Sequence, residues 1–266
     1  MSADVSPARL TAERINVLGI GISAINLQQA TSLVLDAVRK KTRGYICVAG
    51  VHGVMESQDD PDLARIINRG LLCTPDGMPM VWMGWLQGYR HVSRVYGPDL
   101  MIELCEASAG TEVRHFLYGG GPGVAERLKE CLLQRFPGLR IVGVYEPPFR
   151  PLNAKEEEDL RSQVSAARPD IMWVGLSTPK QERFMAEYLS KLDVTIMLGV
   201  GAAFDFHSGR VRQAPRWVQR SGFEWLFRLG QEPRRLWRRY LRHNPRFVCR
   251  VAGQVTGLRR FPLRES

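Results

Sequence analysis

The chain has 266 residues, 44% of them apolar, which suits one α/β domain of about 200 residues with a smaller appendage. The formal net charge is +10 and is concentrated near the C-terminus: fifteen arginines and three acids give residues 207–266 a charge of +12, so residues 1–206 sum to −2. The five scattered cysteines form no CxxC pair or Cys/His cluster, residues 1–13 lack a signal-peptide core, and the longest apolar stretch, 194–204, falls short of the roughly 20 residues that span a bilayer. We therefore expect a cytoplasmic protein with neither a disulfide framework nor a metal site, whose membrane contact is peripheral.

Within residues 1–206, short β-rich runs alternate with amphipathic helical patterns. The strands are predicted at Arg14–Ile20, Tyr45–Val48, Leu71–Thr74, His115–Tyr118, Ile141–Tyr145, Ile171–Gly175 and Thr195–Val200, and the helices near 27–41, 60–69, 98–109, 122–135, 154–167 and 179–191. Several of these strands are apolar on both faces, as in a buried parallel sheet. The alternation predicts the α/β fold class, with a parallel sheet covered by helices on both faces.

Residues 207–266 differ in composition and are predicted to form a small helical appendage. Its helices are expected near 215–230, 233–243 and 245–257, separated around Pro233 and Pro245. Arginine binds phosphate through a bidentate fork and tolerates the aromatic neighbours that this segment supplies. The composition predicts a phosphate-rich partner, which a membrane surface, a lipid diphosphate, a nucleotide or a nucleic acid would satisfy.

Four segments are predicted at carboxyl ends of strands, where open α/β sheets bind ligands: 49–53, 74–79, 118–123 and 175–182. Asp76 follows a short strand, and it is either a turn-forming or capping aspartate or a general base aimed into a cleft. The glycines at 119–123 either present backbone N–H groups to an anion or form a tight structural turn.

Three other features each have a structural and a functional interpretation. Asp60-Pro61-Asp62 matches the DxD element of metal-dependent sugar transferases, but the pair opens a helix, where acids favour the macrodipole, so we reject it as a metal site. His52 and His207 each have two interpretations, a packing residue or a residue with a ligand or catalytic role.

Several short motifs occur in order along the chain: Pro75-Asp76-Gly77-Met78-Pro79, Arg94-Val95-Tyr96-Gly97-Pro98-Asp99-Leu100, Pro179-Lys180-Gln181-Glu182, Gly199 to Phe206 with Gly209-Arg210-Val211, Ala214 to Trp217, and Glu224 to Leu229 with Glu232-Pro233-Arg234-Arg235. Taken together, these motifs resemble the WecG/TagA/CpsF glycosyltransferases over roughly residues 15 to 250. Each segment alone is a weak signal, and their order along one chain makes the resemblance specific.

The resemblance implies a membrane-associated, inverting glycosyltransferase with a Rossmann-like domain (residues 1–206) and no metal or other cofactor. Such enzymes transfer a sugar, often N-acetylmannosamine, from a UDP-sugar to a polyprenyl-diphosphate-linked saccharide in surface polysaccharide synthesis. The appendage (residues 207–266) completes the site and meets an anionic membrane at the inner face. Family members have been seen as oligomers, so a homo-oligomer is a further expectation.

The resemblance also assigns roles to residues. Asp76 matches the proposed catalytic base, and Arg228, Arg235 and Arg238 match arginines that hold the diphosphate. The residues expected to contact substrate are His52, Gly77, Asp99, Gly120, Gln181, Glu182 and Asp205.

Three alternatives stay open at this point. A hexosyl transferase of exopolysaccharide assembly belongs to the same class. A nucleotide-dependent oxidoreductase fits the sheet pattern but lacks a clear dinucleotide fingerprint. A nucleic-acid-binding protein fits the arginines, although we expect no nucleic-acid partner.

Overall fold

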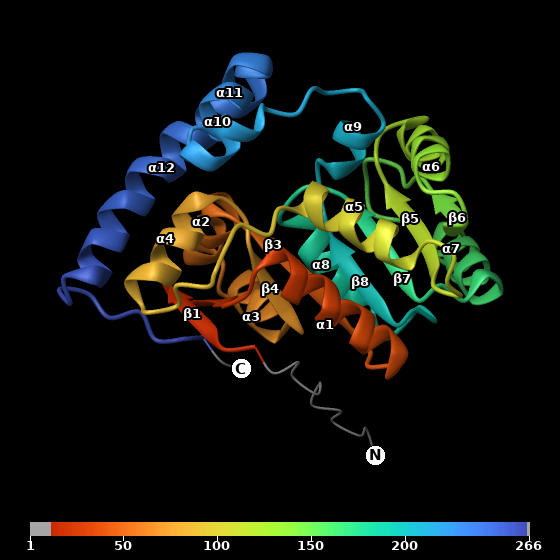
Figure 1. Cartoon of the computed structure of the whole chain (residues 1–266), viewed down its shortest axis with the longest axis horizontal. Helices are drawn as coiled ribbons and strands as arrows, with labels where there is room; N and C mark the ends of the chain where they lie inside the picture. Colours follow the sequence, from red (N-terminus) through yellow and green to blue (C-terminus); the bar gives the residue numbers. More distant parts are fainter. Residues whose placement is uncertain (1–11, 265–266) are drawn as a thin grey trace.

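The computed structural model describes residues 12–264, apart from the side chain of Arg235, and it has an α/β fold (Figure 1). Its centre is a six-stranded parallel sheet with the strand order β4-β3-β8-β7-β5-β6. The strands are β3 (Gly44–Ala49), β4 (Leu72–Pro75), β5 (Arg114–Gly119), β6 (Arg140–Tyr145), β7 (Ile171–Gly175) and β8 (Ile196–Gly199). The parallel sheet predicted from the sequence is therefore confirmed.

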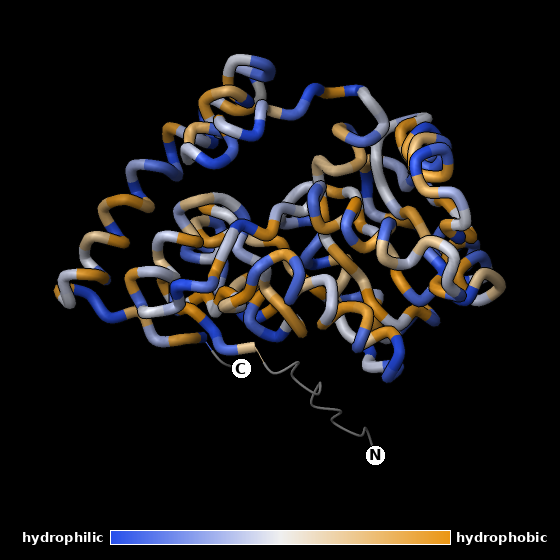
Figure 2. Tube along the Cα trace, in the orientation of Figure 1, coloured by the Kyte–Doolittle hydropathy of each residue, from blue (hydrophilic) through white to orange (hydrophobic). Residues whose placement is uncertain are grey.

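Helices cover both faces of this sheet and enclose a core on each side. The body helices are α1 (Leu27–Arg39), α2 (Val51–Asp59), α3 (Pro61–Arg69), α4 (Met78–Leu86), α5 (Gly97–Ser108), α6 (Val124–Arg135), α7 (Ala154–Ala167), α8 (Lys180–Tyr188) and α9 (Ala203–His207). One core contains residues of α2, α3, α4, α7 and α8, and the other contains residues of α1, α5, α6 and α9. The neighbouring strand residues Ile46 and Cys47 enter different cores, as the pleat of a strand requires. Figure 2 shows the apolar strands at the centre.

The strand predicted over 14–20 is wrong in its extent and in its partner. The chain forms an antiparallel hairpin of β1 (Arg14–Val17) and β2 (Ile20–Ser23), outside the parallel sheet. Leu18 and Gly19 both have positive φ, 54° and 85°, as the two central residues of a tight hairpin turn require. The Ser23 hydroxyl accepts a hydrogen bond from the Cys73 amide at 3.0 Å, so the hairpin lies beside β4.

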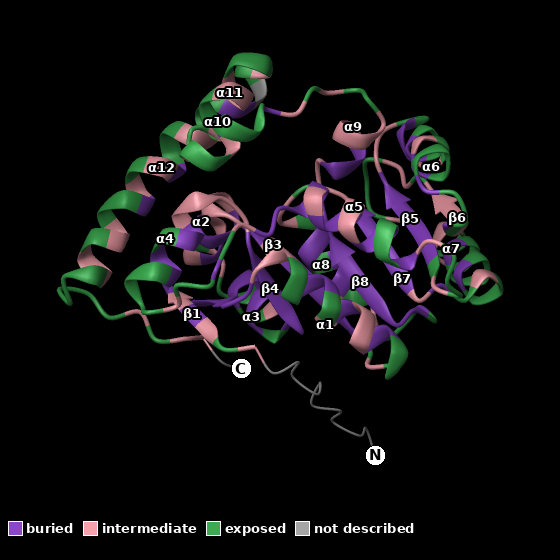
Figure 3. Cartoon of the chain, viewed as in Figure 1, coloured by how far each residue is buried: buried purple, intermediate pink, exposed green. Residues whose placement is uncertain are grey.

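Three helices of the body, α2, α4 and α9, were not predicted, and one predicted helix break is absent. The appendage contains α10 (Arg216–Ser221), α11 (Glu224–Gln231) and α12 (Pro233–Val255). The single helix predicted over 215–230 is wrong, because Gly222 ends α10 with a φ of +83°. Pro245 lies inside α12 and does not interrupt it. Proline removes one helical hydrogen bond, but the buried side chains of His243, which pairs with Glu56 of α2, and Phe247, which lies in the core, hold α12 on the body from both sides of that position. Figure 3 shows the outer turns of α12 exposed.

The chain after α12 returns to the N-terminal hairpin. The Asn16 side-chain amide donates to the Phe261 carbonyl at 2.7 Å, the Arg264 amide donates to the Gly19 carbonyl at 3.2 Å, and the Leu18 amide donates to the Gln254 side chain at 2.9 Å. The first and last described segments therefore lie side by side. Within residues 12–264, no helix is both long enough and apolar enough to cross a membrane.

Candidate active site

Asp76 lies at the carboxyl end of β4, next to the end of β3. Its amide donates to the Ala49 carbonyl at 3.1 Å, and a Cβ placed on Gly50 would lie 3.5 Å from the Asp76 Oδ2 atom. Gly77 then turns the chain with a φ of +89° and begins α4. The close approach of Gly50 leaves room for the carboxylate between the two strand ends.

The surroundings of Asp76 make its carboxyl group a weak acid. The pKa of Asp76 is raised to about 6, chiefly by burial and also by the Glu224 and Asp99 carboxylates, against the lowering effect of Arg94 and Arg228. A carboxylate with a pKa near 6 is a stronger base than an ordinary aspartate and is still ionised at neutral pH. Of the predicted residues, the structure thus brings Asp76, Gly77, Asp99 and Arg228 together.

Arg94 joins this strand end to the appendage. The segment that carries it runs along β4, where the Val95 amide donates to the Pro75 carbonyl at 2.9 Å. The Arg94 guanidinium stacks 3.9 Å from the Tyr96 ring centroid, donates to the Gln219 side chain at 2.8 Å and pairs with Glu224. Gln219 and Glu224 belong to α10 and α11, so Arg94 holds both helices over the site.

Arg228 reaches the same cluster from α11. Its guanidinium lies 5.7 Å from the Phe206 ring centroid. Burial works against its charge, but Tyr96, Tyr240, Glu224 and Asp76 together raise the pKa of Arg228. The Arg238 side chain is exposed, 5.3 Å from the Trp237 ring centroid, and the side chain of Arg235 lies outside the described residues. Of the three predicted arginines, Arg228 is the one that the structure places beside Asp76.

We expect substitution of Glu224 by glutamine to loosen the appendage. Both partners of the Arg94–Glu224 pair are largely buried, with side-chain exposures of 11% and 15%, so removing the negative charge leaves a poorly solvated guanidinium and costs about 2 kcal/mol. Trypsin should then cut faster within residues 207–231, and the thermal midpoint should fall. Glu130→Gln, which breaks an exposed pair with Arg127, is the control and should change neither measurement. Equal trypsin rates for Glu224→Gln and the wild type would show that the pair does not hold the appendage.

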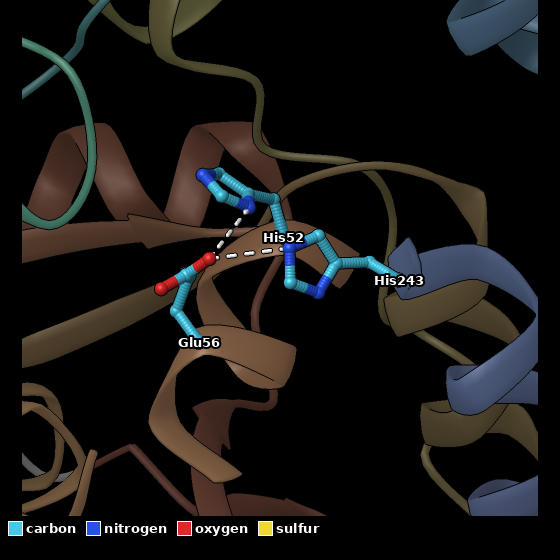
Figure 4. Close-up of side chains that lie close together, drawn as sticks. All are labelled: His52, Glu56 and His243. Carbon is cyan, nitrogen blue, oxygen red and sulfur yellow. Dashed lines mark ion pairs between the residues drawn. The ribbon is translucent and has the colours of Figure 1, made fainter. Parts of the chain in front are cut away.

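His52 belongs to a second cluster, which α2 and α12 form together (Figure 4). The Nε2 atom of His243 lies 3.1 Å from Glu56 Oε1, the Nδ1 atom of His52 lies 3.9 Å from the same oxygen, and the two rings are 5.1 Å apart. The three ligating atoms lie within 4.8 Å of one another, as in a metal site. However, Arg239 adds positive charge at His52, and Arg242 and Arg246 add it at His243. Because these guanidinium groups repel a cation, we interpret the cluster as a contact between the body and the appendage.

The same cluster predicts that acid loosens α12. Burial lowers the pKa of His52 to about 3, with Arg239 and His243 acting in the same direction, and burial also lowers the pKa of His243. An unfolded histidine takes up its proton near pH 6.5, so this contribution to stability is complete above about pH 6.5 and is lost as the pH falls towards 3. Hydrogen exchange of α12 amides, corrected for intrinsic rate, should show faster opening at pH 4 than at pH 7. A His52→Gln/His243→Gln variant should show a shallower pH dependence, and an unchanged one would contradict the assignment.

The glycine-rich segment after β5 has a structural role that the sequence left open. Gly120 has a φ of +82°, and a Cβ there would lie 3.2 Å from Val124 and 3.4 Å from Phe204. The amides of Gly123 and Ala125, at the start of α6, both donate to the Glu146 carboxylate at 3.0 Å. The anion predicted for this helix N-terminus is thus supplied by the chain itself.

Asp205 and His207 lie on α9, close to that loop. Arg210 pairs with Asp205 at 3.6 Å and lies 2.9 Å from where a Cβ of Gly121 would be. His207 Nε2 lies 2.9 Å from the Pro98 carbonyl, and burial lowers the pKa of His207, so its bonding favours the packing interpretation. Arg210 also lines a surface cavity of about 340 Å³ with Pro122 and Ser208.

Gln181 and Glu182 begin α8 beneath the end of β8. The Glu182 Oε1 atom accepts hydrogen bonds from the Thr178 hydroxyl at 2.9 Å and from the Gln181 side-chain Nε2 at 3.1 Å. Burial raises the pKa of Glu182. The Gln181 Oε1 atom is buried without a hydrogen-bond partner among the described residues, 3.5 Å from where a Cβ of Gly201 would be. The Glu182 Oε2 atom is likewise buried without a hydrogen-bond partner among the described residues, so Gln181 and Glu182 each keep one acceptor oxygen free at the strand ends.

The sequence reasoning missed the partners that fix these side chains. Asp60 caps α3 by accepting from the Leu63 amide at 3.1 Å and pairs with Arg183, as expected for a capping residue. Arg94 and Tyr96 stand in the same family motif, but the pairing of Arg94 with Glu224 joins two segments that are 130 residues apart. Glu146 had no sequence signal, because it follows a strand on the far side of the Gly119–Gly123 turn.

The sequence is similar to known proteins over most of its length. A sequence model described as "Glycosyl transferase WecG/TagA/CpsF family" matches residues 15–261. An N-acetylglucosaminyldiphosphoundecaprenol N-acetyl-beta-D-mannosaminyltransferase from Bacillus spizizenii (strain ATCC 23059 / NRRL B-14472 / W23) is 30% identical over 207 residues, which is 78% of this chain and 78% of the relative. A protein of the same name from Bacillus subtilis (strain 168) is 31% identical over 182 residues, 68% of this chain and 69% of the relative.

Proposed function

This chain belongs to the WecG/TagA/CpsF family of glycosyl transferases, and on that premise we propose that it transfers N-acetylmannosamine or a related sugar from a UDP-sugar to a polyprenyl-diphosphate-linked saccharide. The names of the two Bacillus relatives support the sugar and the lipid-linked acceptor. The observation that carries the reaction is the placement of Asp76, with its pKa raised to about 6, beside Arg94 and Arg228.

We propose that transfer inverts the anomeric carbon in a single displacement. An acceptor hydroxyl attacks the anomeric carbon while the Asp76 carboxylate takes the hydroxyl proton, and the bond from that carbon to the UDP oxygen breaks. The donor diphosphate gains negative charge as it leaves. The pKa of Asp76 supports this role, because the group is ionised at neutral pH and is basic enough to accept a proton as the new bond forms.

Arginine side chains, in this proposal, stabilise the leaving diphosphate without a metal. Arg228 faces the cluster, and Arg235 and Arg238 follow on α12, spaced by three residues and so on one helical face. A positive charge aimed at the developing oxyanion is the largest stabilisation available to such a reaction. The nucleotide sugar would lie along the strand ends, bordered by Gly77, Asp99, Gln181, Glu182 and Asp205, whereas His52 and Gly120 keep the structural roles described above.

We further propose that residues 207–266 form a membrane-binding appendage of a body made by residues 1–206. The appendage carries a charge of +12 and exposes Trp217 and Leu241, of which 74% and 67% are accessible. Such a surface attracts anionic lipid and places aromatic rings at the headgroup level. A peripheral position on the cytoplasmic face, and association with further copies, are parts of this proposal.

The direct test measures UDP release from a panel of UDP-sugars, with a short-chain polyprenyl-diphosphate-linked N-acetylglucosamine as acceptor. Acceptor-dependent release with UDP-N-acetylmannosamine, undiminished in EDTA, is the expected result. Release with a UDP-hexose instead would identify the exopolysaccharide hexosyl transferase alternative. A folded protein that neither turns over nor binds any UDP-sugar would contradict the proposal, and product anomeric configuration read by NMR checks inversion.

A further inference from the structure

Helix α4 presents an apolar outer face that residues 12–264 leave partly exposed. Its nine residues include no charged side chain, and Trp82, Trp85 and Leu86 are 44%, 37% and 67% exposed. These positions are spaced by three and one residues, so they share one side of the helix, while Met80, Val81 and Met83 face the core. A surface helix of a soluble body normally carries polar groups on that side.

This face continues into the appendage. A Cβ built on Gly222, between α10 and α11, would lie 2.8 Å from the Trp82 ring, so the ring lies directly against that backbone. Next to this contact Phe223 is 59% exposed and Leu226 is 52% exposed. The outer side of α4 and the start of α11 therefore form one apolar surface, which we call the α4–α11 surface.

Charge decides which partner fits the α4–α11 surface. Arg216 and Arg220, one turn apart on the adjacent α10, are exposed, and the appendage as a whole carries +12. A second copy of this chain would bring the same positive charge to the contact, whereas anionic lipid headgroups neutralise it, at about 1 kcal/mol for each arginine near the surface. Exposed tryptophans beside arginines are also the residues that favour the bilayer interface.

We propose that the outer face of α4 enters the interface of an anionic bilayer together with α10 and α11, so that the catalytic body itself, and not the appendage alone, contacts lipid. Helix α4 begins two residues after Asp76 and directly after Gly77. Seating α4 in the headgroup region would therefore hold the Asp76 carboxylate close to the membrane plane, where the diphosphate of a lipid-linked acceptor lies. This last step rests on the proposed function, and the lipid contact does not.

The test compares Leu86→Glu with the matched change Phe149→Glu. Phe149 is 85% exposed and follows β6, at the opposite edge of the sheet from β4. Leu86→Glu should weaken flotation with vesicles of phosphatidylglycerol and phosphatidylethanolamine by about tenfold or more, because burying a leucine side chain is worth roughly that factor. Phe149→Glu should float like the wild type, and both variants should keep the wild-type thermal midpoint.

A transfer assay separates this proposal from the proposed function. With a short-chain, water-soluble acceptor, Leu86→Glu should match the wild type, and with the long-chain acceptor embedded in vesicles it should lose activity in proportion to binding. If Leu86→Glu floats with vesicles as well as the wild type does, the lipid contact is overturned. It is also overturned if Leu86→Glu loses as much activity with the soluble acceptor as with the vesicle-embedded one. If sedimentation instead shows a dimer of the wild type that Leu86→Glu dissociates, a second copy covers the surface and the proposal is wrong. Absence of transfer by the wild type with every acceptor contradicts the proposed function alone, since flotation is measured without turnover.

Discussion

Replacing Asp76 with asparagine is expected to reduce transfer by about 10²–10⁴-fold, the usual contribution of a positioned general base. Asparagine keeps the size and the hydrogen-bonding shape of the side chain but cannot accept the acceptor's proton. The hydrogen bond from the Asp76 backbone amide to the Ala49 carbonyl does not involve the side chain and should persist. The variant should therefore keep the wild-type thermal midpoint and should still bind the UDP-sugar. Steady-state turnover with saturating donor and acceptor measures the loss of transfer, and calorimetry measures whether the donor still binds.

The pH profile gives an independent check of the same residue. Because burial raises the pKa of Asp76 to about 6, the base is mostly protonated below pH 6 and mostly ionised above it. Turnover of the wild type should therefore rise with an apparent pKa near 6 and then level off. The residual activity of Asp76→Asn should lack that rise. Turnover by Asp76→Asn at the wild-type rate would remove Asp76 from the base role.

Replacing Arg228 with glutamine is expected to reduce turnover by about 10²–10³-fold, which is the cost of losing one group that stabilises a developing oxyanion. The loss should be in kcat more than in KM, because the charge on the diphosphate grows as the bond to the sugar breaks. The guanidinium of Arg228 also lowers the pKa of Asp76, so the profile of this variant should shift to higher pH.

Arg161→Gln is the matched control for Arg228→Gln. Arg161 is an exposed arginine on α7 that pairs with Glu158, and its loss changes the net charge by the same amount. Its turnover should equal that of the wild type. If Arg228→Gln changed only KM, the arginine would bind donor and transition state equally and would have no part in stabilising the leaving group.

Features that depend on short, regular patterns could be predicted from the sequence. The parallel strands were found because both faces are apolar, and Asp76 was found because it follows one of them. The hairpin was missed because its turn requires a positive φ at Leu18, and leucine rarely adopts that conformation. Helix α4 was missed because its side chains are apolar on every side. Its sequence therefore lacks the 3.6-residue alternation of apolar and polar residues by which a helix is recognised.

Long-range contacts set the limits of that reasoning. Pro245 predicts a break when only local bonding is considered, and the packing of His243 and Phe247 on the body outweighs the one lost hydrogen bond. The glycines after β5 suit an anion, but only the folded chain brings Glu146 to the amides of Gly123 and Ala125. The contact of Arg94 with Glu224 spans 130 residues, which no sequence spacing reports.

The return of the C-terminal segment to the N-terminal hairpin has a consequence for biosynthesis. On the ribosome, β1 and β2 emerge first, yet the Leu18 amide and the Gly19 carbonyl find their partners only when residues 254–264 leave the exit tunnel. The hairpin therefore stays incompletely bonded while the residues between it and that segment are synthesised. The end of α12 and the segment that follows it thus complete the bonding of a hairpin whose Leu18 amide lies 236 residues before its partner Gln254.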